Sequence, residues 1–338
     1  MKRVIIIPTW LGHFDKNVNF LKSCIEFKID VPIKFVVSNS DEKKELLNII
    51  NRLEFSEVLN LEIVEIETVI QKFKPEITLS DIEDIKSLHT KFKNIYNSKH
   101  PYQGIKKIYA LRYFDYDQAL LLDSECAFIK PTNINELFDE YFENPHIFYT
   151  PHDRINANLQ TITNASLKSL EWLDISDVKS KWVFESLYWM IDKSILNEMF
   201  ADIENNLNRD LYTEYTTNAG EIFEVITYYS YIYINNDKFN YNFINYYDLL
   251  KKYITNDFES YINLKSGTFG GMLEFMFQFI DDTQYDAIYQ IINDYKIRFC
   301  RLDNSNLHLY KKATKTSKYL NMIVSSDNQS EILKFLNQ

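Results

Sequence analysis

Glycine is scarce in this chain. The 338 residues include only six glycines, at positions 12, 104, 220, 267, 270 and 271. Neither the G-x-G-x-x-G pattern of dinucleotide-binding folds nor the G-x-x-x-x-G-K-[ST] pattern of P-loops can be drawn through those positions. Both of these glycine-based phosphate-binding loops are therefore excluded. Three of the glycines lie in residues 265–271, which could form a loop close to a ligand, a mobile lid or a tight turn.

Cysteine is also rare. The three cysteines, Cys24, Cys126 and Cys300, are far apart and form no C-x-x-C pair. This set predicts reduced thiols in a cytoplasmic protein and excludes a disulfide framework. The six histidines show no zinc-binding spacing. No apolar run approaches the roughly 18 residues of a membrane-spanning helix, which leaves a peripheral contact at the inner face of a membrane open.

Positive charge is in the minority. The chain has 37 Lys and Arg residues against 48 Asp and Glu residues, which gives a formal net charge of −11. This balance opposes binding to a nucleic-acid backbone, so we expect no nucleic-acid partner. A single nucleotide remains compatible with it, because a bound divalent cation supplies positive charge locally.

Short apolar runs alternate with amphipathic segments, mostly in the first third of the chain. Strands are predicted at 4–7, 33–37, 61–66, 119–122, 147–150, 231–234 and 297–302. Helices are predicted around 18–25, from a cap at Asp41 to Leu53, and over 81–96 and 104–114. This alternation predicts an α/β fold with α/β/α layers and a mainly parallel sheet. No linker is visible, so we expect a catalytic domain over 1–240 and a mostly helical C-terminal extension, 241–338, packed on it.

Two acids directly follow the predicted strand 119–122. In an extended segment residues two apart share a face, so Asp123 and Glu125 would point together into one crevice. Open α/β sheets bind ligands at this end of their strands. Carboxylates suit Mg²⁺ or Mn²⁺, which in turn can hold a diphosphate. The alternative is a solvated strand end that carries two surface acids.

The sequence around these acids resembles the metal-binding motif of GT-A-type glycosyltransferases. An apolar strand is followed by Asp123-Ser-Glu125, an apolar stretch and Lys130-Pro131. The motif departs from the commoner Asp-x-Asp because its last acid is Glu. Residues 5–9 also resemble the first strand of that fold. Residues 102–107 and 224–231 resemble stretches in uncharacterised bacterial glycosyltransferase-like proteins with the same Asp-Ser-acid motif. The resemblance covers about residues 1–235.

This resemblance implies a nucleotide-diphosphate sugar as donor and Mn²⁺ or Mg²⁺ as metal. Asp123 would lie near the ribose or the phosphates, and Glu125 would bind the metal. His308 would complete the metal shell, or it is an ordinary loop histidine. Pro8 and Thr9 would border the nucleotide base.

Two residues upstream belong to the same predicted donor site. Gln103 and Lys107 are spaced i and i+4 on a predicted helix, which would direct Lys107 toward a phosphate or a donor hydroxyl. The alternative for Lys106 and Lys107 is a solvated helix face.

Two glutamates are candidate general bases. Glu224, Tyr228 and Tyr231 follow i, i+4, i+7 spacing along one helix face. Glu185 lies in an aromatic stretch that includes Trp182. Either carboxylate could take the proton of an acceptor hydroxyl, and either could instead be a salt-bridged residue of the core.

Together these observations predict a metal-dependent glycosyltransferase. It would move a sugar to a hydroxyl of a bacterial surface glycan, such as a capsule or lipooligosaccharide, at the cytoplasmic face of the membrane. A non-catalytic carbohydrate-binding protein is one alternative. A sugar-phosphate nucleotidyltransferase is another, but residues 8–12 hold a single glycine where that class carries a glycine-rich loop.

Overall fold

The structure is a computed structural model. It describes residues 1–88, 100–151, 182–185, 189–206, 208–217, 224–253, 285–301, 323–325 and 329–336. His308 and residues 265–271 lie outside the described residues.

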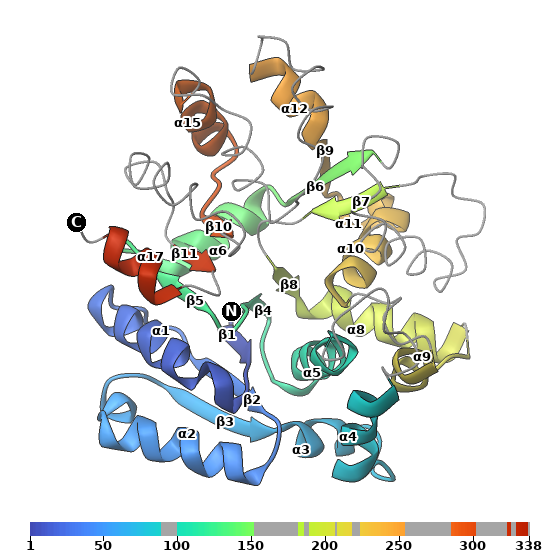
Figure 1. The fold of residues 1–338 in the computed structure, drawn as a ribbon. Helices are drawn as coiled ribbons and strands as arrows, with labels where there is room; N and C mark the ends of the chain where they lie inside the picture. Colours follow the sequence, from blue (N-terminus) through green and yellow to red (C-terminus); the bar gives the residue numbers. More distant parts are fainter. Residues whose placement is uncertain are drawn as a thin grey trace.

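A five-stranded sheet forms the centre of the fold, in the order β3-β2-β1-β4-β8 (Figure 1). Its strands are β1 (Arg3–Pro8), β2 (Ile33–Val37), β3 (Leu61–Glu65), β4 (Gln118–Leu121) and β8 (Met190–Asp192). The first four are mutually parallel, and β8 runs antiparallel to β4. The predicted α/β class with a mainly parallel sheet is confirmed.

Helices cover the sheet because its strands are apolar on both faces. All residues of β4 are buried, and so are Val4 to Pro8 of β1. The connections from β1 to β2 and from β2 to β3 hold α1 (Phe14–Glu26) and α2 (Ser40–Arg52). The connection from β3 to β4 holds α3 (Ile66–Gln71), α4 (Leu79–Leu88) and α5 (His100–Tyr113).

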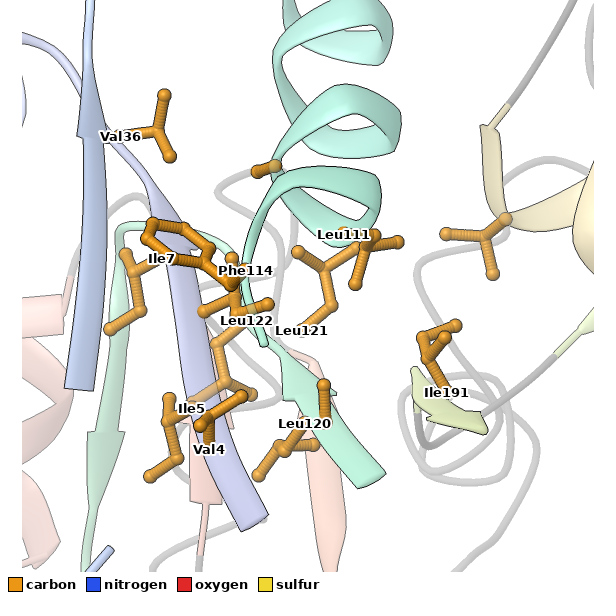
Figure 2. Packing of buried hydrophobic residues seen from close by; sticks show 14 of the residues in the cluster. Val4, Ile5, Ile7, Val36, Leu111, Phe114, Leu120, Leu121, Leu122 and Ile191 are labelled. Atoms are coloured by element: carbon orange, nitrogen blue, oxygen red, sulfur yellow. The ribbon is translucent and has the colours of Figure 1, made fainter. Parts of the chain in front are cut away.

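Figure 2 shows part of the core between α5 and the sheet, with aliphatic side chains and a phenylalanine. Leu111 of α5 and Phe114 just beyond it lie near side chains at the ends of β1 and β4, among them Ile7, Leu121 and Leu122. Each of these five side chains is at most 4% exposed. Burial of one such side chain stabilises the fold by about 1.5–3 kcal/mol, so this contact holds α5 firmly on the sheet.

Two smaller sheets join distant parts of the chain. One has the order β10-β11-β5 and the other β7-β6-β9. Their strands are β5 (Cys126–Phe128), β6 (His146–Pro151), β7 (Trp182–Glu185), β9 (Asn242–Asn245), β10 (Phe299–Arg301) and β11 (Ile323–Ser325). β9 pairs with β6 and β11 pairs with β5, so residues beyond 240 complete sheets begun by earlier ones.

The remaining helices lie around these sheets (Figure 1). They are α6 (Ile134–Glu143), α8 (Lys193–Ala201), α9 (Leu211–Thr217), α10 (Glu224–Ile234), α11 (Asn236–Phe239), α12 (Tyr246–Tyr253), α15 (Tyr285–Asp294) and α17 (Gln329–Leu336). α8, α9 and α10 contact α5, and α17 contacts α1. In the described part of the chain, no helix has the length and hydropathy needed to cross a bilayer.

Two local predictions were wrong. Residues 231–234 form the last turn of α10 and not a strand. α10 is buried on all sides from Glu224 to Ile232, so it lacks the polar face by which helical periodicity is recognised. The cap of α2 is Asn39 and not Asp41, because the Asn39 side chain accepts hydrogen bonds from the backbone N–H groups of Asp41 and Glu42.

Most other predicted elements of the first 150 residues are confirmed. The strand predicted at 33–37 is β2, and the strand predicted at 119–122 is β4, displaced by one residue. The helix predicted over 81–96 is α4, which covers 79–88, and residues 89–96 lie outside the described part.

Candidate functional site

The strand order reverses direction between β1 and β4. From β1 the chain proceeds to β2 and β3 on one side, and it returns to the other side of β1 as β4. Ligands of open α/β sheets bind at the carboxyl ends of the strands beside such a reversal. Here the residues beyond those ends are Thr9 after β1, Ser38 after β2 and Asp123 after β4. We therefore take this edge of the sheet as the candidate site.

One buried lysine links the site to two carboxylates. Lys107 of α5 places its Nζ 2.9 Å from Asp123 Oδ1 and 3.0 Å from Glu224 Oε1. The same Nζ lies 4.3 Å from the centre of the Trp189 ring. Burial lowers the pKa of Lys107, but Asp123 and Glu224 outweigh this effect, so the pKa is raised above its ordinary value. Lys107 is therefore an ammonium at physiological pH.

The three charged groups differ in their access to solvent. The Asp123 side chain is 20% exposed, whereas that of Glu224 is 2% exposed. Lys107 lies between them with a side chain that is 10% exposed. Asp123 therefore lies on the solvent side of Lys107, and Glu224 lies in the core behind it.

Gly104 provides the room that Glu224 occupies. A Cβ atom at this position would lie 2.9 Å from Tyr215 Cε1 and 3.2 Å from Glu224 Oε2. Both distances are shorter than ordinary carbon contacts in a packed core. Glu224 Oε2 and the Tyr215 hydroxyl are buried and have no hydrogen-bond partner among the described residues. One of the six glycines therefore serves the close approach of α9 and α10 to α5.

Glu125 is held from the opposite side, by the loop after β1. His13 Nδ1 lies 2.6 Å from Ser124 Oγ and 3.6 Å from Glu125 Oε2. The Ser124 hydroxyl donates to Glu125 Oε2 at 3.1 Å. Because Ser124 is then the donor to Glu125, His13 acts as the donor to Ser124 through Nδ1–H. This arrangement orients the Glu125 carboxylate.

Two buried polar side chains fix the loops around the site. Asn17 donates from Nδ2 to the Ser124 carbonyl at 2.9 Å and accepts from Thr9 Oγ1 at 2.5 Å. Lys106 donates from Nζ to the Thr9 carbonyl at 2.8 Å and to Ser38 Oγ at 3.0 Å. These bonds join the ends of β1 and β2 and the acidic loop to α1 and α5. The alternative of a solvated helix face for Lys106 and Lys107 is wrong, because both are buried.

The expected geometry of the acid pair was wrong. Ser124 and Glu125 form a turn, in which the Cys126 N–H donates to the Asp123 carbonyl at 3.2 Å. The rule that residues two apart share a face applies only to extended backbone. Asp123 consequently contacts Lys107 of α5, and Glu125 contacts His13 near the start of α1. Both carboxylates still lie beyond the same end of β4.

The other predicted site residues are distributed as follows. Pro8 is buried at the end of β1, beside the loop that holds Thr9. Gln103 is exposed on α5, so it does not share the buried environment of Lys107. The backbone of Glu185 belongs to β7 and pairs with Phe148 of β6.

His13, Asn17 and Ser124 were missed by reasoning from the sequence. Asn17 carried a usable signal, because it falls on the buried stripe of α1 that includes Phe14, Leu21 and Cys24. A polar residue in such a stripe requires internal hydrogen-bond partners. His13 and Ser124 carried no signal, since their contact joins segments that are 111 residues apart.

A divalent cation fits the donor atoms of this site. Mg²⁺ binds through one or two carboxylates and otherwise keeps water and phosphate oxygens as ligands. Asp123 and Glu125 provide two partly exposed carboxylates, with 20% and 16% exposure. No group of three or more His, Cys, Asp or Glu side chains suited to a metal occurs within the described ranges. Asp123 and Glu125 would therefore hold the ion, with water and phosphate as its further ligands.

Searches with the sequence gave no match to a protein family or to a curated protein. Solved structures with a similar arrangement include mouse xyloside xylosyltransferase 1 in its apo form, with a TM-score of 0.40 and 9% identity over 80% of this chain and 96% of that one. S. aureus TarS 1–349 in complex with UDP has a TM-score of 0.34 and 12% identity over 95% of this chain and 83% of that one. Core-mannan synthase A from Aspergillus fumigatus, in its Mn/GDP form, has a TM-score of 0.33 and 11% identity over 68% and 66%.

Proposed function

We propose that this chain is a GT-A-like glycosyltransferase that moves a sugar from a nucleotide-diphosphate sugar to an acceptor hydroxyl. One observation carries the proposal. Asp123 and Glu125 are partly exposed carboxylates at the carboxyl end of β4, beside the β1/β4 reversal, and each is oriented by a second side chain. This is the place and the donor chemistry that a metal-bound diphosphate requires.

The transfer breaks the bond between the anomeric carbon and the diphosphate oxygen, and it forms a bond from that carbon to the acceptor oxygen. The divalent ion supplies Lewis-acid stabilisation of the leaving diphosphate when it is bound. Glu125 is held for this task by Ser124 and His13, and Asp123 is held by Lys107. The acceptor hydroxyl gives its proton to a general base, for which Glu185 is the candidate, and the nucleoside diphosphate leaves with the bonding electron pair.

The remaining side chains of the site shape the donor pocket. Pro8 and Thr9 border the space for the base, and the bonds of Thr9 to Asn17 and Lys106 fix that border. Gln103 lies at the exposed side of α5, where it can meet a sugar hydroxyl. In this proposal Glu185 on β7 is the candidate base on the acceptor side.

The acceptor we propose is a bacterial surface glycan, a capsule or a lipooligosaccharide, extended at the cytoplasmic face of the membrane. Support comes from the resemblance of residues 102–107, 123–125 and 224–231 to bacterial glycosyltransferase-like proteins. We propose His308 as a further candidate ligand of the metal.

A thermal-shift panel tests the donor site. The full chain is heated with UDP, GDP, CMP or ADP, each with and without MnCl₂. A ligand that binds only the folded state raises Tm by mass action. We expect one nucleoside diphosphate to raise Tm only with Mn²⁺, and we expect Asp123→Asn/Glu125→Gln to abolish the shift. Asp139→Asn is the matched control, because Asp139 pairs with Arg3 at the start of β1 and its side chain is 68% exposed.

If no nucleotide at millimolar concentration raises Tm, with or without Mn²⁺, the proposal is contradicted. In that case glycan arrays would test the carbohydrate-binding alternative, which predicts binding without nucleotide or metal. A shift that survives in the Asp123→Asn/Glu125→Gln variant also counts against the site assignment.

A further inference from the structure

Lys107 Nζ is surrounded by two carboxylates and an aromatic ring of the protein. An ammonium has three donors. Lys107 directs Nζ to Asp123 Oδ1 at 2.9 Å and to Glu224 Oε1 at 3.0 Å, and the Trp189 ring covers the cation at 4.3 Å. A phosphate oxygen that approached Lys107 would compete with these groups for the ammonium. Lys107 is therefore placed to act on Asp123 and not on the donor directly.

The position of Glu224 is also unsuited to direct proton transfer from a substrate. A general base must come within hydrogen-bond reach of the hydroxyl it deprotonates, directly or through one water. Glu224 is 2% exposed, and Oε1 is bound to the ammonium of Lys107. Oε2 faces the backbone of Gly104 and the ring of Tyr215. Both oxygens are thus enclosed by protein.

We propose that Glu224 is a positioning residue: through Lys107 it holds the carboxylate of Asp123 in one orientation at the carboxyl end of β4. The inference rests on the proposed function, because it assigns a role within that same site. Glu224 supplies the negative charge that keeps Lys107 in place, and Lys107 transmits this constraint to Asp123.

Charge balance explains why both members of the pair are needed. The site holds two carboxylates on one ammonium, Lys107. Loss of Lys107 alone leaves Glu224 as an uncompensated charge in the core, which is strongly destabilising. Loss of Glu224 alone leaves Lys107 with Asp123 as its one charged partner among the described residues and frees the long lysine chain to move.

The experiment uses the full chain and four variants: Glu224→Gln, Glu224→Leu, Lys107→Met and the double variant Lys107→Met/Glu224→Leu. Isothermal titration with UDP and with GDP, each with MnCl₂, gives Kd. Hydrolysis of a UDP-sugar and of a GDP-sugar, with water as acceptor, gives kcat and KM. Thermal unfolding without ligand gives Tm for the same proteins.

Glu224→Gln keeps an acceptor for Lys107, so we expect Kd and kcat within about five-fold of the wild type. Glu224→Leu removes that acceptor and raises Kd about ten-fold, the equivalent of one charge-assisted hydrogen bond. Lys107→Met raises Kd further. The double variant binds no more weakly than Lys107→Met, because Glu224 acts only through Lys107. Its loss of Tm relative to the wild type is smaller than the sum of the losses in Lys107→Met and Glu224→Leu.

Glu204→Gln is the matched control, because Glu204 pairs with another residue of the helix that carries Lys107. Glu204 pairs with Arg112 of α5, with 2.6 Å between Arg112 Nη1 and Glu204 Oε1, away from the acidic loop. This variant is expected to change Tm and to leave Kd and kcat unchanged.

Three results overturn the inference. A loss of kcat of about 100-fold or more in Glu224→Gln at unchanged Kd identifies a general base. Additive effects on Kd in the double variant show that Glu224 and Lys107 act independently. If the wild type binds neither nucleotide and hydrolyses neither sugar, the proposed function fails, and the positioning role fails with it. Failure of the proposed function can be told apart from failure of the positioning role alone, because the Tm values of the variants would still show coupling between Lys107 and Glu224.

Discussion

At the scale of single residues, the site depends on side chains that are buried and charged or polar. Four of these buried side chains are Lys106, Lys107, Asn17 and Glu224. Asn17 and Lys106 donate to loop carbonyls at the carboxyl end of the sheet. Glu224 binds Lys107, which in turn binds Asp123. Buried polar groups stabilise a structure only when they are paired. The arrangement of the site is therefore fixed before any ligand arrives.

Replacement of Gly104 by alanine tests this arrangement without touching a charged residue. Alanine in a helix interior stabilises by about 1 kcal/mol relative to glycine. Here the added Cβ would lie 3.2 Å from Glu224 Oε2 and 2.9 Å from Tyr215 Cε1, so it pushes Glu224 away from Lys107. We expect Gly104→Ala to lower Tm and to raise the Kd of UDP or GDP with Mn²⁺ several-fold, as measured by calorimetry. A higher Tm with unchanged Kd contradicts the packing described.

At the scale of elements, α5 is the helix on which the site depends, and two lysines bind its carboxyl end: Lys193, and Lys72, which donates to the Tyr113 carbonyl at 2.9 Å. Lys193, the first residue of α8, donates from Nζ to the carbonyls of Leu111, Arg112 and Phe114 at 2.7, 2.8 and 2.9 Å. The last carbonyls of a helix lack partners within the helix. Lys193 satisfies them and ties α8 to α5.

The pH dependence of stability reports this contact. Burial, together with the nearby Lys72, lowers the pKa of Lys193 to about 8 from its ordinary 10.5. Between these values the unfolded chain binds more protons, so the Lys193 contribution to the free energy of unfolding rises as pH increases. We expect the difference between the wild type and Lys193→Met to grow by about 1–2 kcal/mol from pH 8 to pH 10 in denaturant titrations.

Tyrosine ionisation affects both proteins alike and cancels in this difference. Lys44→Met is the control, since the Lys44 side chain on α2 is 74% exposed. A difference that stays constant over this pH range would show that Lys193 titrates normally.

The four parallel strands of the central sheet could be predicted because each is a short apolar or alternating segment, whereas β8 was not predicted. Ile33–Val37 became β2 without adjustment, and Ala119–Leu122 became β4 with a shift of one residue. The contacts of the site could not be predicted, since they join distant elements. Nothing near Lys107 in the sequence indicates that α10 delivers Glu224 to it. The turn at Ser124 and Glu125 also escaped prediction, because no glycine or proline marks it.

At the scale of the whole molecule, the C-terminal segment bonds directly beside the acidic loop. Gln329, the first residue of α17, is 1% exposed. Its Nε2 donates to the Cys126 carbonyl at 2.6 Å and to the Lys16 carbonyl at 3.3 Å, and its Oε1 accepts from Asn19 at 3.0 Å. Cys126 follows Glu125, and Lys16 precedes Asn17. Figure 1 shows α17 beside α1 accordingly.

Gln329→Leu tests whether this docking matters to the site. The substitution leaves the Cys126 and Lys16 carbonyls without this partner, which costs about 1–3 kcal/mol. We expect a lower Tm and a Kd for UDP or GDP with Mn²⁺ that rises a few-fold, because the acidic loop loses its support. Lys334→Met, at an exposed position of α17, should change neither quantity. A lower Tm with an unchanged Kd would limit α17 to a stabilising role.

The bond between Gln329 and Cys126 spans 203 residues of sequence. Ribosomes add about 5–20 residues per second, so roughly 10–40 s pass between the synthesis of these two residues. The strands β1 to β4 are all made before that interval begins. A nascent chain can therefore assemble the four parallel strands of its central sheet early, whereas the partner of the carbonyl beside Glu125 is translated much later.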